Sequence, residues 1–335
     1  MRLPTRSSKQ CDERLLDRRL LEEGLGVAAE LLGRRIDGWT VEFCEHRPNS
    51  SVVRLGLLAG DQPAAVAYYK IGRVPADKDA AAAANRRAQT HHRLTMGRRL
   101  DEQFHELARG RPLQVPRTLA TDPDRGVELA LAVPGRALGR GLQLMALRDT
   151  DRAVALWRLL GEAVAVVEGC ESDQAPPLKH DLDIARAVGR LERLIGPRER
   201  QRLVAMGEEL RDAAERECLQ VLCHGDLSGS HVFHGDAGLA LIDLSWGRMW
   251  RAYDLTTLAV WLDYGLFVPR RTNRPLIAAA VDGYGDPAVV DSPAWRFLRL
   301  WQVVSIAKRE VRGLRGRTRR ALARRELLAT VGARR

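Results

Sequence analysis

Apolar residues occur in short runs between residues 39 and 133 and in longer helical patterns after residue 150. The short runs are rich in Val and Leu and end at turn residues, which is typical of strands. Two stretches among them, one of them rich in Ala, have the composition of helices. The expected strands are 40–43, 52–55, 64–70 and 127–133, and the expected helices are 80–94 and 98–108.

Longer segments with an apolar stripe predict helices at the start of the chain and through its second half. Leu15–Leu32 has an amphipathic pattern. Thr150–Val167 and Leu182–Cys218 are also predicted to be helical, with Thr150 as the N-cap of the first. A strand-rich first part is therefore followed by a larger and mainly helical second part.

The most informative segment begins with the largely apolar run Leu219–Cys223, which leads into His224, Gly225 and Asp226. Such a run predicts a strand that places Asp226 at its end or just inside a loop. Two further short strands, 232–234 and 239–242, are joined by Gly235–Gly238, a good hairpin connection. That hairpin would bring Asp243 back beside Asp226.

Two carboxylates held close together are unfavourable unless a cation lies between them. Kinase-type phosphoryl transfer uses such a pair, one carboxylate orienting the acceptor hydroxyl and the other holding Mg²⁺ on the phosphates. His231, five residues after Asp226, is a further candidate ligand. Either Asp226 or Asp243 alone would more often be an ordinary turn residue, but the spacing, hairpin and flanking strands together favour the functional interpretation.

This segment resembles a known group of enzymes. His224-Gly-Asp226-x4-His231 followed by Ile242-Asp243-Leu is similar to the loop of the aminoglycoside phosphotransferases and choline kinases, which carry Asn where this chain has His231. In having His at that position, the chain resembles the lipopolysaccharide core kinases, which phosphorylate heptose or 3-deoxy-manno-octulosonic acid. The segment Trp250–Leu255 resembles their later basic stretch ending in Asp-Leu, whereas Gly225 is closer to the aminoglycoside group. The resemblance runs from about residue 39 to residue 301.

The resemblance implies an α+β, bilobal protein-kinase-like fold with a small β-rich N-lobe and a larger, mainly helical C-lobe. Residues 1–38 are then expected to form an N-terminal helical extension, and 39–134 the nucleotide-binding N-lobe. Residues 135–307 are expected to form the C-lobe with the catalytic loop and acceptor site, and 308–335 a basic helix or tail.

The resemblance also implies roles for individual residues. Asp226 would accept or orient the acceptor hydroxyl, His224 would position the loop, and Asp254 would brace it. Lys70, at the end of an expected strand, would neutralise the nucleotide phosphates. Lys70 would be braced by a helix glutamate, for which Glu102 fits the family spacing better than Glu106, and a phosphate-covering loop would include Asn49, Ser50 and Ser51.

ATP and Mg²⁺ are the implied cofactors, with Asp243 and His231 as metal ligands. Mg²⁺ prefers oxygen, so an imidazole nitrogen is a poorer ligand than the Asn carbonyl. Three alternatives remain open: a single tightly held metal, Mn²⁺ in place of Mg²⁺, or a contact from His231 to phosphate.

The net charge of +11 is concentrated at the C-terminus, because residues 308–335 contain 11 Lys and Arg against two Glu, a net +9. Such a segment is typical of a solvated basic helix, or of a surface that binds an anionic membrane, a glycolipid or nucleic acid. Few aromatic residues accompany it, which argues against nucleic acid. The five unpaired cysteines, the lack of a long apolar run and the polar N-terminus indicate a cytoplasmic protein, with peripheral attachment at the inner membrane surface as an option.

The sequence therefore predicts an ATP-dependent phosphotransferase that moves the γ-phosphate to a hydroxyl of a sugar or glycolipid. A soluble small-molecule kinase of the aminoglycoside or choline type explains the motif equally well but not the basic tail. A pseudokinase would explain His231, although the presence of Lys70, Asp226 and Asp243 together counts against it. The acceptor and the oligomeric state stay open at this stage.

Overall fold

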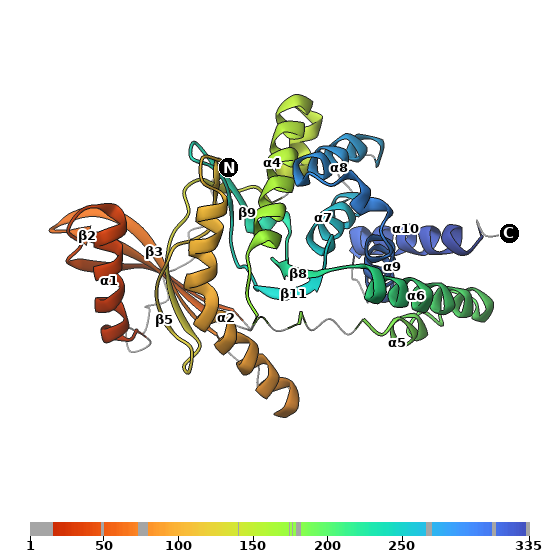
Figure 1. Cartoon of the computed structure of the whole chain (residues 1–335), viewed down its shortest axis with the longest axis horizontal. Coiled ribbons are helices and arrows are strands. Elements are labelled where there is room, and N and C mark those ends of the chain that lie inside the picture. Colours follow the sequence, from red (N-terminus) through yellow and green to blue (C-terminus); the bar gives the residue numbers. More distant parts are fainter. Residues whose placement is uncertain are drawn as a thin grey trace. The chain divides into compact units, whose positions relative to one another are not determined.

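The computed structural model describes residues 16–47, 50–72, 80–139, 141–173, 175, 177–178, 182–265, 270–309 and 313–332. The chain divides into two units (Figure 1). The first comprises Met1–Arg109, Gln114–Pro134 and Gln174–Pro176, and the second comprises Gly110–Leu113, Gly135–Asp173 and Pro177–Arg335. The predicted α+β class, with a β-rich first part and a mainly helical second part, is confirmed.

The first unit contains a five-stranded antiparallel sheet with strand order β1-β2-β3-β6-β5. Its strands are β1 (Gly38–Arg47), β2 (Ser50–Ala59), β3 (Gln62–Gly72), β5 (Thr118–Asp122) and β6 (Val127–Leu131). β1 and β2 are longer than the sequence indicated, so Ser50 and Ser51 lie within β2. The prediction that these two serines belong to a loop is therefore wrong, and Asn49 lies outside the described residues.

Two helices pack on this sheet. α1 (Arg18–Leu32) shares an apolar cluster with Tyr69 and Leu129, and a Cβ added to Gly24 would meet the Leu129 side chain at 2.3 Å. α1 thus packs within the first unit. The two helical stretches expected at 80–94 and 98–108 are one helix, α2 (Ala80–Leu107).

The second unit contains two small sheets. β4 (Leu113–Gln114), β10 (Gly238–Leu241), β9 (Val232–Gly235) and β7 (Arg136–Ala137) form one of them, in that order. The predicted hairpin is confirmed, because β9 and β10 are antiparallel and joined after Gly235. β8 (Gln220–Cys223) pairs antiparallel with β11 (Gly247–Trp250).

Helices form most of the rest of this unit (Figure 1). They are α3 (Gly141–Leu144), α4 (Thr150–Gly169), α5 (Ile184–Gly189), α6 (Pro197–Glu217), α7 (Tyr253–Asp263), α8 (Arg270–Tyr284), α9 (Pro293–Lys308) and α10 (Gly313–Gly332), with 3-10 turns η2 (Met145–Leu147), η3 (Gly229–His231) and η4 (Pro287–Asp291). The N-cap of α4 is Asp149, whose side chain accepts from the Arg152 N–H, and not Thr150 as the sequence suggested.

The basic C-terminal segment forms a docked helix. Ala323, Leu327 and Val331 of α10 are buried in the cluster that α9 and α6 also contribute to. Four of its arginines donate to backbone carbonyl groups of this unit: Arg315 to Gly265, Arg319 to Tyr264, Arg320 to Ala307 and Arg324 to Leu194. Among the described residues, no helix is both long and apolar enough to cross a bilayer.

Candidate active site

The loop after β8 is shaped by a glycine. Gly225 has φ +86°, a backbone conformation that side chains disfavour, and an added Cβ would lie 2.9 Å from both Ser245 Cβ and Leu178 Cδ2. The turn sends the chain from the paired strand end at Cys223 to Asp226, whose side chain is 78% exposed. Asp226 is therefore fixed at its backbone and open at its carboxylate.

Asp254, in the first turn of α7, binds the backbone of this loop. Its Oδ2 accepts from the His224 N–H at 2.6 Å and its Oδ1 from the Gly225 N–H at 3.1 Å. The side chain is fully buried, and burial raises the pKa of Asp254 to about 7, although the two N–H donors act in the opposite direction. The bracing role that the resemblance implied for Asp254 is confirmed by these contacts.

His224 joins the loop to the segment after β10. Its Nε2 lies 2.9 Å from the Ile242 carbonyl oxygen, which can only accept, so Nε2 carries the proton. Its Nδ1 then accepts from the Asp226 N–H at 3.4 Å. Burial, followed by the charge of His231, lowers the pKa of His224 to about 4. The ring is fully buried, and both of its nitrogens are occupied by contacts with the backbone of residues 226 and 242.

His231 lies between the two candidate aspartates. Its Nδ1 is 2.6 Å from the Asp226 carbonyl oxygen, so this nitrogen donates, and it also lies 3.9 Å from Asp226 Oδ2. Its Nε2 is 4.0 Å from Asp243 Oδ2. The ring stacks on that of His224, with centroids 5.8 Å apart and an interplanar angle of 12°. The structure thus brings His224, Asp226, His231 and Asp243 together.

Asp243 follows the predicted hairpin and has an unusual backbone. Its φ is +59°, in the left-handed region that few non-glycine residues adopt. Such conformations cost roughly 1–3 kcal/mol and cluster at functional sites, where the surrounding structure enforces them. The ladder of β10, with the Ile242 N–H donating to the His231 carbonyl at 3.0 Å, directs Asp243 toward His231.

Asp243 and His231 are the two side chains of this loop region that could hold a cation between them. Because Nδ1 of His231 carries the proton in the neutral ring, Nε2 keeps a lone pair on the side of Asp243. A separation of 4.0 Å leaves room for one metal ion bound by both atoms. Among the described residues no group of three or more His, Cys, Asp or Glu could hold a metal, so other ligands would have to come from substrate and water.

Lys70 lies in the first unit, on β3, with Val52 of β2 on one side and Glu128 of β6 on the other. Ser51, which precedes Val52 on β2 and pairs with Ile71, is fully buried, and its hydroxyl is 2.8 Å from His46 Nδ1. Ser50 is also buried and pairs with Arg47 and Gly72.

Glu102, expected to brace Lys70, points to solvent on α2. Its side chain is 63% exposed and pairs with Arg98 at 3.4 Å, one turn earlier. Glu106 is also exposed and pairs with Arg109. The acid of α2 that does face the sheet is Asp101, which is buried and accepts from the Thr118 hydroxyl at 2.5 Å.

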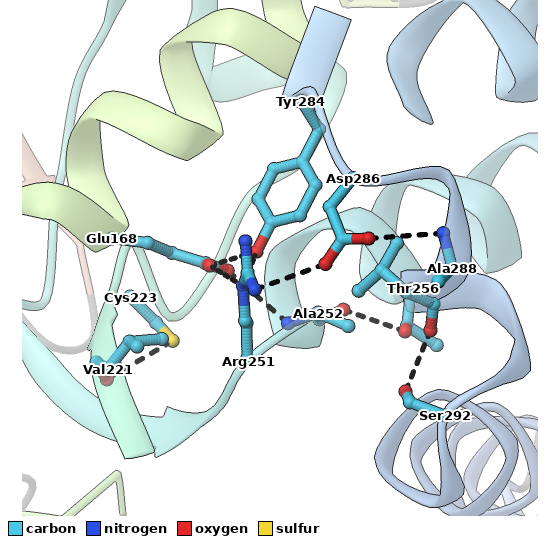
Figure 2. A network of polar contacts seen from close by, with 11 residues as sticks. Glu168, Val221, Cys223, Arg251, Ala252, Thr256, Tyr284, Asp286, Ala288 and Ser292 are labelled. Atoms are coloured by element: carbon cyan, nitrogen blue, oxygen red, sulfur yellow. Dashed lines mark hydrogen bonds and ion pairs between the residues drawn. The ribbon is translucent and has the colours of Figure 1, made fainter. Parts of the chain in front are cut away.

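A buried network beside Asp254 was not found by sequence reasoning (Figure 2). Glu168 of α4 accepts from the Ala252 N–H at 3.3 Å and from the Tyr284 hydroxyl. Arg251 donates through Nε to the Tyr284 oxygen at 2.6 Å and pairs through Nη1 with Asp286 at 3.1 Å. Burial raises the pKa of Glu168 to about 7. The network fixes the turn at Ala252, whose φ is +81°, two residues before Asp254.

One sequence signal could have revealed part of this network. Glu168 falls four residues after Val164 and one after Val167, on the face of α4 that is otherwise apolar and buried. A charged residue on such a face requires a partner, since an unpaired buried charge is costly. The partners come from segments more than 80 residues away, so the sequence could not name them.

Comparison with solved structures identifies the fold. The GDP complex of aminoglycoside 2'-phosphotransferase-IIIa superposes with a TM-score of 0.54 and 15% identity, over 92% of this chain and 97% of that one. A choline/ethanolamine kinase family protein from Mesorhizobium loti gives a TM-score of 0.52 and 16% identity, over 92% and 94% of the two chains. These likenesses show a shared kinase-like, bilobal fold.

The family assignment comes from the sequence itself. None of the curated proteins compared with this chain matches it. The profile of the phosphotransferase enzyme family (APH) matches residues 71–301, well over half of the chain. The matched region contains Asp226, His231, Asp243 and Asp254. This chain therefore belongs to the phosphotransferase enzyme family and is an ATP-dependent phosphotransferase that acts on a hydroxyl group.

Proposed function

We propose that the chain transfers the γ-phosphate of ATP to a hydroxyl of a sugar or glycolipid, with Asp226 orienting the acceptor. The observation that supports this most is the loop in which an exposed Asp226 and a strained Asp243 both lie within 4.0 Å of His231. In this reaction the acceptor oxygen forms a bond to the γ-phosphorus while the bond to the β–γ bridging oxygen breaks. ADP leaves, and the hydroxyl proton passes to the Asp226 carboxylate.

Asp243 and His231 are the residues that would hold a divalent cation, Mg²⁺ or alternatively Mn²⁺. Such a cation, when bound, neutralises charge on the β- and γ-phosphate oxygens. Lys70 is the other proposed group, and its ammonium would offset charge on the nucleotide phosphates.

The choice of acceptor rests on the loop and on charge. His231 and the Trp250–Leu255 segment resemble the lipopolysaccharide core kinases, and a net charge of +11 disfavours a polycationic acceptor such as an aminoglycoside. The alternative is a small-molecule kinase of the aminoglycoside or choline type, supported by the two superposed structures. Attachment of residues 308–335 to an anionic membrane has less support than the sequence suggested, because four arginines of α10 bind backbone carbonyls.

The test is nucleotide binding and product formation in the wild type beside Asp226→Ala and Asp243→Ala. We expect Asp226→Ala to keep ATP binding and to lose turnover by about 100-fold or more, and Asp243→Ala to lose Mg²⁺-dependent ATP binding. Mass spectrometry of core-sugar glycolipid, aminoglycoside and choline incubated with ATP identifies the acceptor. A phosphorylated aminoglycoside or choline would favour the alternative, and a wild type without nucleotide binding would leave a pseudokinase.

A further inference from the structure

Lys70 shares a row of side chains with a glutamate. In an antiparallel sheet, residues directly opposite each other project from the same face with Cβ atoms roughly 4.5–5.5 Å apart. The register of β2, β3, β6 and β5 places Val52, Lys70, Glu128 and Thr121 in one such row. The neighbouring row, with Tyr69 and Leu129, projects to the opposite face and packs on α1. Glu128 is therefore the carboxylate directly opposite Lys70, whereas Glu45, in the same row, lies one strand further away beyond Val52.

The helix on this face does not supply a comparable acid. α2 runs from Ala80 to Leu107 and contains three acidic residues, all in its last two turns. Each has another partner: Asp101 the Thr118 hydroxyl, Glu102 the Arg98 guanidinium, and Glu106 that of Arg109. The first two turns and the middle of α2 carry no acid at all.

α2 instead contributes a cation. Arg93 donates through Nη1 to Glu128 Oε2 at 2.8 Å, and both side chains are only about one-fifth exposed, 22% and 20%. The bond joins the middle of the helix to the central part of the sheet. Both groups also act on Asp101. Burial is the main cause that raises the pKa of Asp101 to about 7, while the charge of Glu128 raises this pKa further and the charge of Arg93 lowers it.

We propose that Glu128, held in place by Arg93, is the residue that positions Lys70 for the nucleotide phosphates, in the role expected for Glu102. This inference rests on the proposed function of Lys70. It inverts the expected source of the charges, since the strand provides the carboxylate and the helix provides a second cation.

Physical reasons support a role in positioning. A lysine carries its charge on a flexible four-carbon stem, and a carboxylate fixed next to it restricts that stem to a few rotamers. Glu128 is itself fixed by a charge-assisted hydrogen bond to a guanidinium, which is shorter and stronger than a neutral one. Because the cluster is partly buried, its charges are weakly screened by salt. An ordered ammonium binds phosphate with less loss of entropy than a mobile one.

The test compares Glu128→Gln with Glu102→Gln, which represents the expected brace, and with Glu42→Gln as a matched control. Glu42 lies on β1 of the same sheet and forms an ion pair of similar length with Arg54, at 3.0 Å. Dissociation constants for ATP and for adenosine are measured on each folded variant by calorimetry. We expect Glu128→Gln to weaken ATP binding about tenfold with adenosine binding unchanged, whereas Glu102→Gln and Glu42→Gln bind both as the wild type does.

Adenosine separates positioning from general damage, since it lacks the phosphates that Lys70 would meet. Equal loss for ATP and adenosine would mean a purely structural role and would overturn the inference, as would loss in Glu102→Gln with Glu128→Gln unaffected. If Glu128→Gln does not fold, the double variant Arg93→Met with Glu128→Gln leaves no unpaired Arg93 and is expected to show the same selective loss. A wild type that binds no ATP would refute the proposed function itself, whereas an unaffected Glu128→Gln in a nucleotide-binding wild type refutes this inference alone.

Discussion

His231 distinguishes this catalytic loop from the Asn-containing loops that it resembles. The two nitrogens of its ring make different contacts: Nδ1 donates to the Asp226 carbonyl, and Nε2 faces Asp243 at 4.0 Å. The first holds the loop and the second suits a cation. A substitution at this residue therefore separates the two roles, provided that more than one metal is tried.

We expect His231→Asn to change the metal preference of the enzyme. A side-chain oxygen suits Mg²⁺ better than an imidazole nitrogen does, so the ratio of Mg²⁺- to Mn²⁺-supported turnover should rise by about tenfold, a difference of about 1.4 kcal/mol in activation free energy. Turnover at saturating ATP with each metal is the measurement, with His231→Ala as the control that removes both contacts. Loss of activity with both metals in His231→Asn would show that the bond to the Asp226 carbonyl dominates.

The active-site residues could be predicted from sequence where they are local and not where they depend on register. Asp226, His231 and Asp243 fall within 18 residues, so a hairpin signal and a motif were enough to place them together. Lys70 and Glu128 are 58 positions apart, and they become neighbours only because β6 inserts between β3 and β5. No local pattern encodes that strand order, and a helix glutamate was expected instead.

At the scale of elements, the boundaries of α2 show how packing overrides local composition. The stretch between the two expected helices is Thr95–Gly97, and its β-branched threonine and its glycine weaken the helical signal. Leu94, Leu100 and Phe104 are nevertheless buried along one continuous side of the helix. That side docks on the sheet through Arg93 and Asp101. Tertiary contacts thus stabilise a continuous helix through Gly97, where composition alone predicts a break.

The network that joins α4, α8 and the turn before α7 should make stability depend on pH in an unusual direction. Burial raises the pKa of Glu168 from its ordinary 4.5 to about 7. Between these values the folded state holds a proton that the unfolded chain releases. The contribution of this group to stability is therefore complete below pH 4.5 and is lost as the pH rises through 7. Asp101 and Asp254, with pKa values also raised to about 7, act in the same direction.

Glu168→Gln isolates one part of this dependence, because glutamine is close in size to the protonated carboxyl and does not titrate. Its single oxygen can replace only one of Oε1 and Oε2, which accept from the Ala252 N–H and the Tyr284 hydroxyl. We expect the fall in unfolding free energy between pH 5 and pH 8 to be smaller in the variant than in the wild type by about 2 kcal/mol. Urea denaturation at several pH values measures it. Asp286→Asn is a suitable control, since it keeps Glu168 and removes the charge that pairs with Arg251, while the Asn oxygen can still accept from the Ala288 N–H. Identical pH profiles for wild type and Glu168→Gln would contradict the assignment.

At the scale of the whole molecule, the positive charge of the C-terminus has a structural use that composition did not reveal. Arginines of α10 donate to carbonyl groups at the C-terminal ends of α7 and α9, those of Tyr264 and Ala307. Arg299 of α9 is placed between Asp263 at 2.7 Å and Glu326 of α10 at 3.0 Å. A sequence shows the number of such charges but not the carbonyls they meet, so a docked helix and a membrane-binding tail have the same composition.

These two roles of α10 predict different outcomes for two sets of variants. Leu327 is 1% exposed, and truncation of a buried leucine costs about 2–5 kcal/mol, so Leu327→Ala should lower the unfolding free energy by that amount. Replacement of the exposed Arg317 and Arg325 by Gln should leave stability within about 0.5 kcal/mol of the wild type. The same double variant, tested by sedimentation with anionic phosphatidylglycerol vesicles, should bind membranes more weakly if these two exposed arginines form a membrane surface, since each contributes about 1 kcal/mol there. An unstable Leu327→Ala together with no vesicle binding by the wild type would assign α10 wholly to the fold, and a stable Leu327→Ala would contradict the docked helix.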